Sequence, residues 1–142
     1  MKALTVCQPC AAYIASGEDR TEKRRWSTRY RGPLAIHAGS SRKWLDGMSP
    51  SPDMVFGAVV AVARLVACVE DSTRNRVYFR AWCRKYGYQH LLEEPYYRHV
   101  EGPVIWVLDD IRPLCTPVAM RGHQRLWGLD AETIARIERE LA

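Results

Sequence analysis

The chain has 142 residues, of which 47% are hydrophobic and 26% charged, and its formal net charge is +5 at pH 7. These proportions are ordinary for a globular protein, and the length favours a single domain, 1–142. The longest apolar run, Met54–Val69, is interrupted by Arg64 and is shorter than the roughly 20 residues of a membrane-spanning helix, so we expect no membrane contact. Five cysteines and first residues without a secretory signal pattern predict a reducing, cytoplasmic location.

The first third of the chain is predicted to hold short strands around one helix. Pro9 fits the first position of a helix and Gly17 fits its end, so Pro9–Ser16 is predicted to be helical. Alternation and turn residues predict strands at Ala3–Val6, Arg24–Trp26 and Pro33–Ala38, with a turn at Arg31–Pro33 and a loop at Ser49–Pro52.

The middle of the chain combines a long apolar segment with an aromatic one. Met54–Val69 is rich in β-branched residues and is predicted to be one buried strand, bent at Gly57. Asp71 and Ser72 offer caps for a helix over Arg74–Tyr86 that ends at a glycine.

A strand at Val104–Ile111 and a helix capped by Asp130 complete the predicted elements. In that last helix Ile134, Ile137 and Leu141 share one face. Strands outnumber helices and do not alternate with them in a βαβ rhythm. We therefore predict an α+β fold, a small β-barrel with peripheral helices, rather than a doubly wound sheet.

Cys7 and Cys10 are separated by two residues at the predicted start of the first helix, which raises three interpretations. A zinc ribbon needs a second close pair, but Cys68, Cys83 and Cys115 stand alone. A redox pair needs a thioredoxin-like βαβ context, which the following sequence does not provide. We favour the third interpretation, in which the two cysteines are independent small side chains at a strand-to-helix corner. We therefore expect neither a metal nor a cofactor.

The segment Arg20–Gly32 concentrates positive charge beside aromatic rings. It holds six basic residues and one acid, with Trp26 and Tyr30 among them. Cations that neutralise phosphates and rings that stack on bases are what single-stranded nucleic acid requires. The alternative is a solvated basic hairpin with Trp26 in the core.

A resemblance to a known family emerges from the order of these residues. Gln8-Pro9 entering a helix, then Gly17, then Glu22-x-Arg24-x-Trp26, resembles the ASCH domain of the PUA-like superfamily. The later stretches GAVVAVARLVACV, GPVIWVLDDIRPL and RGHQRLWGL resemble its central and closing strands. The resemblance implies a PUA-like barrel with a cleft between the barrel and the first helix. It also implies RNA or other nucleic acid as the partner, bound in that cleft.

Departures from the family pattern bear on activity. Cys7 and Cys10 stand where the family often has Arg and Trp around Gln-Pro. Some relatives are amidohydrolases of acetylated cytidine nucleosides, with a Lys and a Thr at the positions of Asp19 and Glu22. We therefore expect a nucleic-acid-binding module and no catalytic residue; the alternative is a small hydrolase, amidohydrolase- or nuclease-like, acting on a nucleoside or nucleic acid.

The candidate binding residues fall into two kinds. Cations on the hairpin are expected to neutralise phosphates, whereas Arg24, oriented by Glu22, is expected to present its planar fork to a base or phosphate. His37 is interpreted either as a cleft acid or base or as a core histidine bonded to backbone. The full set of candidates is Gln8, Glu22, Lys23, Arg24, Arg25, Trp26, Arg29, Arg31, His37 and Arg121.

Half of the aromatic residues lie in an insert at about 72–101 that the ASCH resemblance does not cover. The insert is interpreted as a stacking platform, as a segment that packs onto the barrel, or as a surface for a protein partner or self-association.

Overall fold

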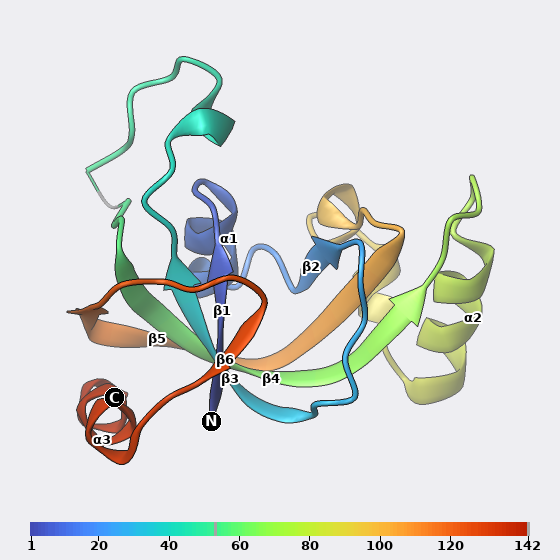
Figure 1. Cartoon of the computed structure of the whole chain (residues 1–142). Coiled ribbons are helices and arrows are strands. Elements are labelled where there is room, and N and C mark those ends of the chain that lie inside the picture. The colour runs from blue at the N-terminus through green and yellow to red at the C-terminus, as the bar shows by residue number, and fades with distance from the viewer. Residues whose placement is uncertain (53, 142) are drawn as a thin grey trace.

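The structure, a computed structural model, describes residues 1–52 and 54–141. Six strands form one sheet in the order β2-β5-β4-β3-β1-β6, in which β1 and β3 are parallel and the other neighbours antiparallel. The long strands curl the sheet into half of a barrel, so the predicted α+β small-barrel fold is confirmed (Figure 1). The strands are β1 (Lys2–Val6), β2 (Thr21–Arg24), β3 (Gly32–Ala38), β4 (Ala58–Glu70), β5 (Val104–Ala119) and β6 (Leu126–Gly128).

Three α-helices lie around this sheet, with α2 and α3 at its opposite ends (Figure 1). Each was predicted, but α1 and α2 begin later than expected, by one residue and by three. The helices are α1 (Cys10–Ser16), α2 (Val77–Tyr86) and α3 (Ala131–Glu140), with short 3₁₀ turns at η1 (Lys43–Leu45), η2 (Gln89–Leu92) and η3 (Tyr97–His99).

The predicted strand Arg24–Trp26 is wrong in its bounds. β2 pairs with β5 from Thr21 opposite Val107 to Arg24 opposite Val104, where β5 begins. Beyond Arg24 the chain has no further β5 residue to pair with, so it leaves the sheet. Trp26 therefore lies in a bend, where its carbonyl accepts a hydrogen bond of 3.0 Å from Trp106 Nε1.

The two long strands also differ from their predicted bounds. β4 begins after Gly57, whose φ of 72° favours glycine, so residues 54–57 are not part of the strand. β5 continues eight residues past Ile111, through Pro113 and Pro117. The ladder between β2 and β5 ends at Val107, so the later part of β5 is an edge that tolerates residues without an N–H group.

Three apolar clusters hold the sheet and its covers together. The central one, around Trp106, Leu4 and Ile14, joins α1 to the concave side of the sheet. A second joins α3 to the sheet through Ile137, from the predicted apolar face of that helix. A third packs the insert against β4 and β5 through Phe79, and this supports the interpretation that the insert packs onto the barrel.

The insert is fixed to the sheet by one buried carboxylate, Asp71. Its two oxygens accept hydrogen bonds from Thr73 N, Thr73 Oγ1 and, at 2.8 Å, the backbone N–H of Phe79. These donors lower the pKa of Asp71, against the effect of burial. The predicted cap is wrong in its position, because α2 begins later than expected and its N-cap residue is Arg76, which makes no side-chain cap bond. Asp71 still accepts from the first turn of α2, across eight residues.

We predict that Asp71→Ala destabilises the chain by about 2 to 3 kcal/mol, because it leaves a buried N–H of α2 without its acceptor. Urea denaturation followed by circular dichroism measures this. Asp130→Ala is the matched control, since Asp130 caps the exposed helix α3 through Thr133 N, and its removal should cost about 1 kcal/mol. Equal losses for the two variants would contradict the role given to Asp71.

Candidate functional site

A cleft opens beside β2, between the start of α1 and the loop that carries η1. It consists of an outer cavity of about 670 Å³ and an inner cavity of about 340 Å³, which share Lys23, Arg24 and Trp44. The outer cavity is otherwise lined by Arg25, Trp26, Arg76, Glu101, Gly102 and Pro103. The inner one is otherwise lined by Val6, Cys7, Pro9, Cys10 and Glu22.

Arg24 lies where the two cavities meet and joins two strands of the site, β2 and β1. Its Nη2 donates to Glu22 Oε2 at 2.8 Å and to the carbonyl oxygen of Thr5 at 2.6 Å. Glu22 is buried, and its Oε1 accepts from Lys23 N at 2.9 Å. Among the described residues, Arg24 Nε is buried without a hydrogen-bond partner. The predicted orientation of Arg24 by Glu22 is therefore present, and part of the guanidinium remains unused.

The outer cavity brings four cationic side chains together around one carboxylate. Lys23 Nζ lies 2.6 Å from Glu101 Oε2, and both side chains are 55% exposed, so water screens this ion pair. Arg25 is exposed, whereas Arg76 donates to the carbonyls of Asp71, Val100 and Gly102. The balance of charge at the mouth of the cleft is positive.

Two tryptophans border the cleft in different ways. Trp26 packs edge-on against Trp106 with ring centroids 4.9 Å apart, and the guanidinium of Arg125 covers it at 4.3 Å. Trp44 is 55% exposed and lines both cavities. Trp44 was not among the predicted site residues, because nothing in its local pattern shows that the loop carrying η1 lies beside the start of α1.

Beneath the cleft lies a group of buried acids. Asp19 Oδ1 accepts from Thr21 N at 2.9 Å and from Thr21 Oγ1 at 3.3 Å. Burial, followed by the charge of Glu22, raises the pKa of Asp19 to about 7. Burial also raises the pKa of Glu22, although Arg24 opposes it. Asp19 therefore holds a proton over much of the range in which an ordinary carboxyl is charged.

The cysteines of the opening motif line the inner cavity as free thiols. Burial and the nearby Glu22 raise the pKa of Cys10 to about 11, so its thiol stays protonated at neutral pH. This is the opposite of what a redox thiolate at a helix start requires. In residues 1–52 and 54–141, no three His, Cys, Asp or Glu side chains are grouped so that they could hold a metal ion.

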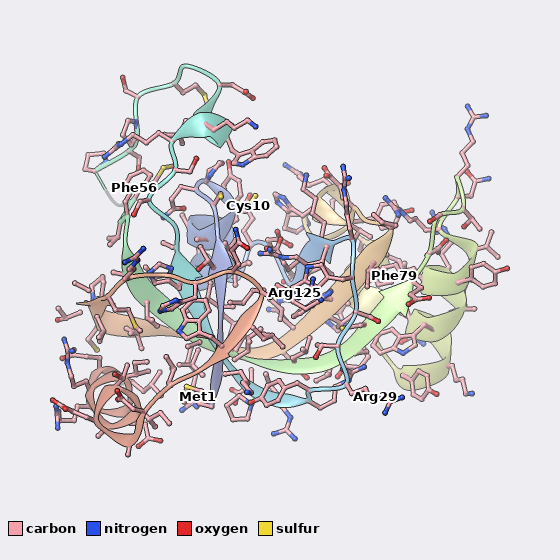
Figure 2. All side chains as sticks on the ribbon, viewed as in Figure 1. Met1, Cys10, Arg29, Phe56, Phe79 and Arg125 are labelled. Atoms are coloured by element: carbon pink, nitrogen blue, oxygen red, sulfur yellow. The ribbon has the colours of Figure 1, made fainter. Side chains whose placement is uncertain are left out.

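Several predicted site residues lie outside the cleft. Gln8 is buried, and its amide bonds Val55 O and Ala12 N, so it joins α1 to the loop before β4. Arg29 lies near the bottom of the view in Figure 2, whereas Cys10 lies near the top. Arg31 donates to Thr28 O and Tyr30 O within its own turn.

His37 and Arg121 belong to a separate polar pocket on the other side of β1. His37 is buried, and its Nε2 lies 2.8 Å from Met120 O, as the core interpretation of this histidine expects. Of the predicted residues, the structure brings Glu22, Lys23, Arg24, Arg25 and Trp26 to the cleft.

No helix among the described residues is long and apolar enough to cross a membrane.

The fold matches solved structures of ASCH proteins. The crystal structure of ASCH from Zymomonas mobilis aligns with a TM-score of 0.56 at 19% identity, covering 99% of this chain and 95% of that one. A serine-to-alanine mutant of that protein gives a TM-score of 0.57 at 19% identity, over 99% and 96% of the chains. A tyrosine-to-phenylalanine mutant gives 0.56 at 18%, over 99% and 98%.

These alignments show that the chain has the ASCH fold, as its motif predicted, and at this identity they show the fold alone. Neither a protein-family model nor a curated protein matches the sequence.

We predict that Asp19 makes stability fall as pH rises from about 4 to 7. Over that range the unfolded chain loses the Asp19 proton, while the folded chain, with a pKa of about 7, retains it. Asp19→Asn keeps the acceptor for Thr21 and cannot ionise. Its free energy of unfolding, relative to the original chain, should therefore increase between pH 4.5 and 7.5 by on the order of 3 kcal/mol.

Urea denaturation at four pH values measures this difference. Asp46→Asn, at an exposed position, is the matched control, and the pH dependence of Asp19→Asn should exceed that of this variant. Equal pH dependence of the two variants would contradict the raised pKa of Asp19.

Proposed function

We propose that this chain is a nucleic-acid-binding module of the ASCH fold that holds RNA or another single-stranded segment in the cleft beside β2. The observation that carries the proposal is the division of the cleft. A basic outer cavity adjoins a mostly apolar inner cavity, and Trp44 and Arg24 lie at the junction. A nucleotide has the same division, since a charged phosphate is joined to a flat base.

The outer cavity supplies the electrostatic part of such binding. Lys23 and Arg25 are exposed, so they suit phosphates, which they neutralise without reading sequence. The net charge of the chain, +5, adds a general attraction for a polyanion. Binding of this kind weakens as salt concentration rises.

The inner cavity supplies the part that a base would occupy. Its walls are Val6, Pro9 and the two cysteines, with Trp44 at the entrance. The exposed face of Trp44 is available for stacking, and stacking needs a base that is not covered by neighbours in a duplex. For this reason the proposal specifies a single-stranded segment.

Arg24 and Glu22 give the inner cavity a polar wall. Arg24 has guanidinium N–H groups beyond the two bonds of its Nη2, and each oxygen of Glu22 has a lone pair beyond the bond it already accepts. A ligand that offers an acceptor next to a donor satisfies both groups. The edges of nucleobases carry such pairs.

The hydrolase alternative has weaker support. The resemblance places a catalytic Lys of the amidohydrolase relatives at Asp19, and here that position holds a buried carboxyl bonded to Thr21. A carboxyl cannot supply the amine that such a reaction uses.

We predict that Trp44→Ala weakens binding of a fluorescein-labelled oligouridine of ten nucleotides by about 1 to 3 kcal/mol, the effect of losing one stacking ring. Fluorescence anisotropy measures the affinity, and thermal unfolding should be unchanged because the ring is largely exposed. Tyr86→Ala is the matched control: Tyr86 is also 55% exposed but lies on α2. The proposal fails if both variants bind alike, or if the original chain does not bind.

We predict that two arginines of the basic segment Arg20–Gly32 act differently. Arg25 lines the outer cavity, whereas Arg29 does not. Arg25→Ala should reduce the slope of log affinity against log salt by about 0.7, the value for one phosphate contact in a single strand. Arg29→Ala should leave the slope unchanged. Equal changes in slope would show that the whole basic segment, and not the cleft, contacts the nucleic acid.

A further inference from the structure

The outer side of α2 concentrates exposed apolar side chains. Among the described residues, five large hydrophobic side chains are exposed, and three of them lie on this helix: Val77 at 56%, Tyr78 at 62% and Tyr86 at 55%. The helix stands at one end of the sheet, with one side toward β4 and the other side away from the rest of the chain (Figure 1). Exposed apolar residues that are clustered in this way mark a site of contact with another molecule, whereas single ones do not.

Helical spacing joins these side chains into an aromatic stripe. Tyr78, Trp82 and Tyr86 follow one another at intervals of four residues, so they lie along one line of the helix surface. The ring centroids of Trp82 and Tyr86 are 5.4 Å apart, and Tyr88 packs on Trp82 at 4.9 Å. The stripe is therefore a packed row of aromatic side chains and not a set of separate rings.

The helix that carries the stripe is fixed from its other side. Phe79 and Cys83 are fully buried in the cluster that packs the insert on β4 and β5 (Figure 2). Asp71 accepts a hydrogen bond from the backbone N–H of Phe79 at 2.8 Å. A surface that is ordered before binding loses little entropy when a partner covers it. Tyrosine and tryptophan also supply large contact areas with only two rotatable side-chain bonds.

The charge around the stripe has one sign. Residues 72–92 hold five arginines and lysines and no aspartate or glutamate. Arg76 and Arg80 donate to acceptors within the chain. The other three cations are exposed and form no ion pair with another described residue: Arg74, Arg84 and Lys85. These three exposed cations can therefore meet the carboxylates of a partner.

We infer that the outer side of α2 is a docking surface for an acidic segment of another protein, whose carboxylates meet the three exposed cations and whose apolar side chains cover Val77 and the aromatic stripe. The inference goes beyond the proposed function and does not depend on it. Tyrosine, tryptophan and arginine are the side chains that contribute most to protein–protein binding, and complementary charge selects the partner. The helix has about three turns, so the contact is small and the complex is expected to be weak and transient.

Two other occupants fit this surface less well. A second copy of the chain, related by two-fold symmetry, would bring like charges together, because α2 carries no acid to oppose its cations. A single-stranded nucleic acid needs free ring faces on which its bases can stack. Here Trp82 already has Tyr86 and Tyr88 against it, and Lys85 Nζ lies 5.3 Å from the ring centroid of Tyr86. An acidic peptide pairs with the cations and covers the apolar side chains without needing a free ring face.

A display selection on the full chain tests the inference. Random twelve-residue peptides on phage are selected on the immobilised protein, and the enriched peptides should combine aspartate or glutamate with large apolar residues. The most enriched peptide, synthesised with a fluorescein label, then serves as the probe in fluorescence anisotropy. Its affinity should fall as salt concentration rises, because salt screens ion pairs at an exposed surface.

Variants of the full chain locate the peptide on α2. Tyr78→Ser should weaken peptide binding about 10-fold or more, the effect of truncating a central aromatic side chain of an interface. Arg84→Glu should weaken it by on the order of 5-fold, because an exposed ion pair becomes a repulsion. Met48→Ser is the matched control and should bind the peptide as the original chain does: Met48 is 63% exposed, against 62% for Tyr78, but lies just beyond η1. All three side chains are exposed, so circular dichroism should be unchanged in each variant.

The acidic partner would be overturned by a selection that enriches no peptide, or that enriches basic or uncharged ones. A probe that binds Tyr78→Ser and the original chain alike would place the contact elsewhere. Dimers in sedimentation velocity that disappear in Tyr78→Ser would assign the surface to a second copy of the chain, and a weaker affinity of Tyr78→Ser for oligouridine would assign it to nucleic acid. Oligouridine binding by the original chain is a separate measurement, so failure of the proposed function and failure of this inference are distinguishable.

Discussion

The guanidinium of Arg24 is the interaction on which the rest of the site depends. It joins the last residue of β2 to the carbonyl of Thr5, near the end of β1, and it neutralises the buried carboxylate of Glu22. Without it, Glu22 would be an uncompensated buried charge, which is costly enough to rearrange the site. Because Arg24 has donors beyond these bonds, the group that holds the cleft together can also contact a ligand in it.

Parts of this arrangement follow from the sequence alone. Glu22 and Arg24 are two residues apart, so on a strand they share a face and can form a bond. Asp130 caps α3 because its short carboxylate accepts from the helix start, a local interaction. The helical spacing of Ile137 and Leu141 identified the face of α3 that packs on the sheet. In each case the physical cause lies within a few neighbouring residues.

The remainder depends on contacts between distant parts of the chain. Trp44 reaches the cleft only because the loop that carries η1 lies beside the start of α1, and no local pattern encodes that contact. Pro113 can lie within β5 because the ladder between β2 and β5 ends before it, and the sequence does not show where that ladder ends. The pocket around Thr5 is closed by residues more than a hundred positions later. The basic segment Arg20–Gly32 was predicted correctly as a composition, but it is not a hairpin, because β2 and β3 are not neighbours in the sheet. Which of its cations lie at the cleft depends on the path of this connection.

The central claim is that the cleft beside β2 is where nucleic acid binds, and nuclear magnetic resonance of the tryptophan indoles tests it most directly. The five tryptophans sample different regions: Trp44 and Trp26 border the cleft, Trp106 is in the core, Trp127 is near His37, and Trp82 is on α2. On titration with a short oligouridine, the Trp44 indole signal should shift most and the Trp82 signal should stay in place. Shifts that centre on Trp82 and leave Trp44 unchanged would contradict the account.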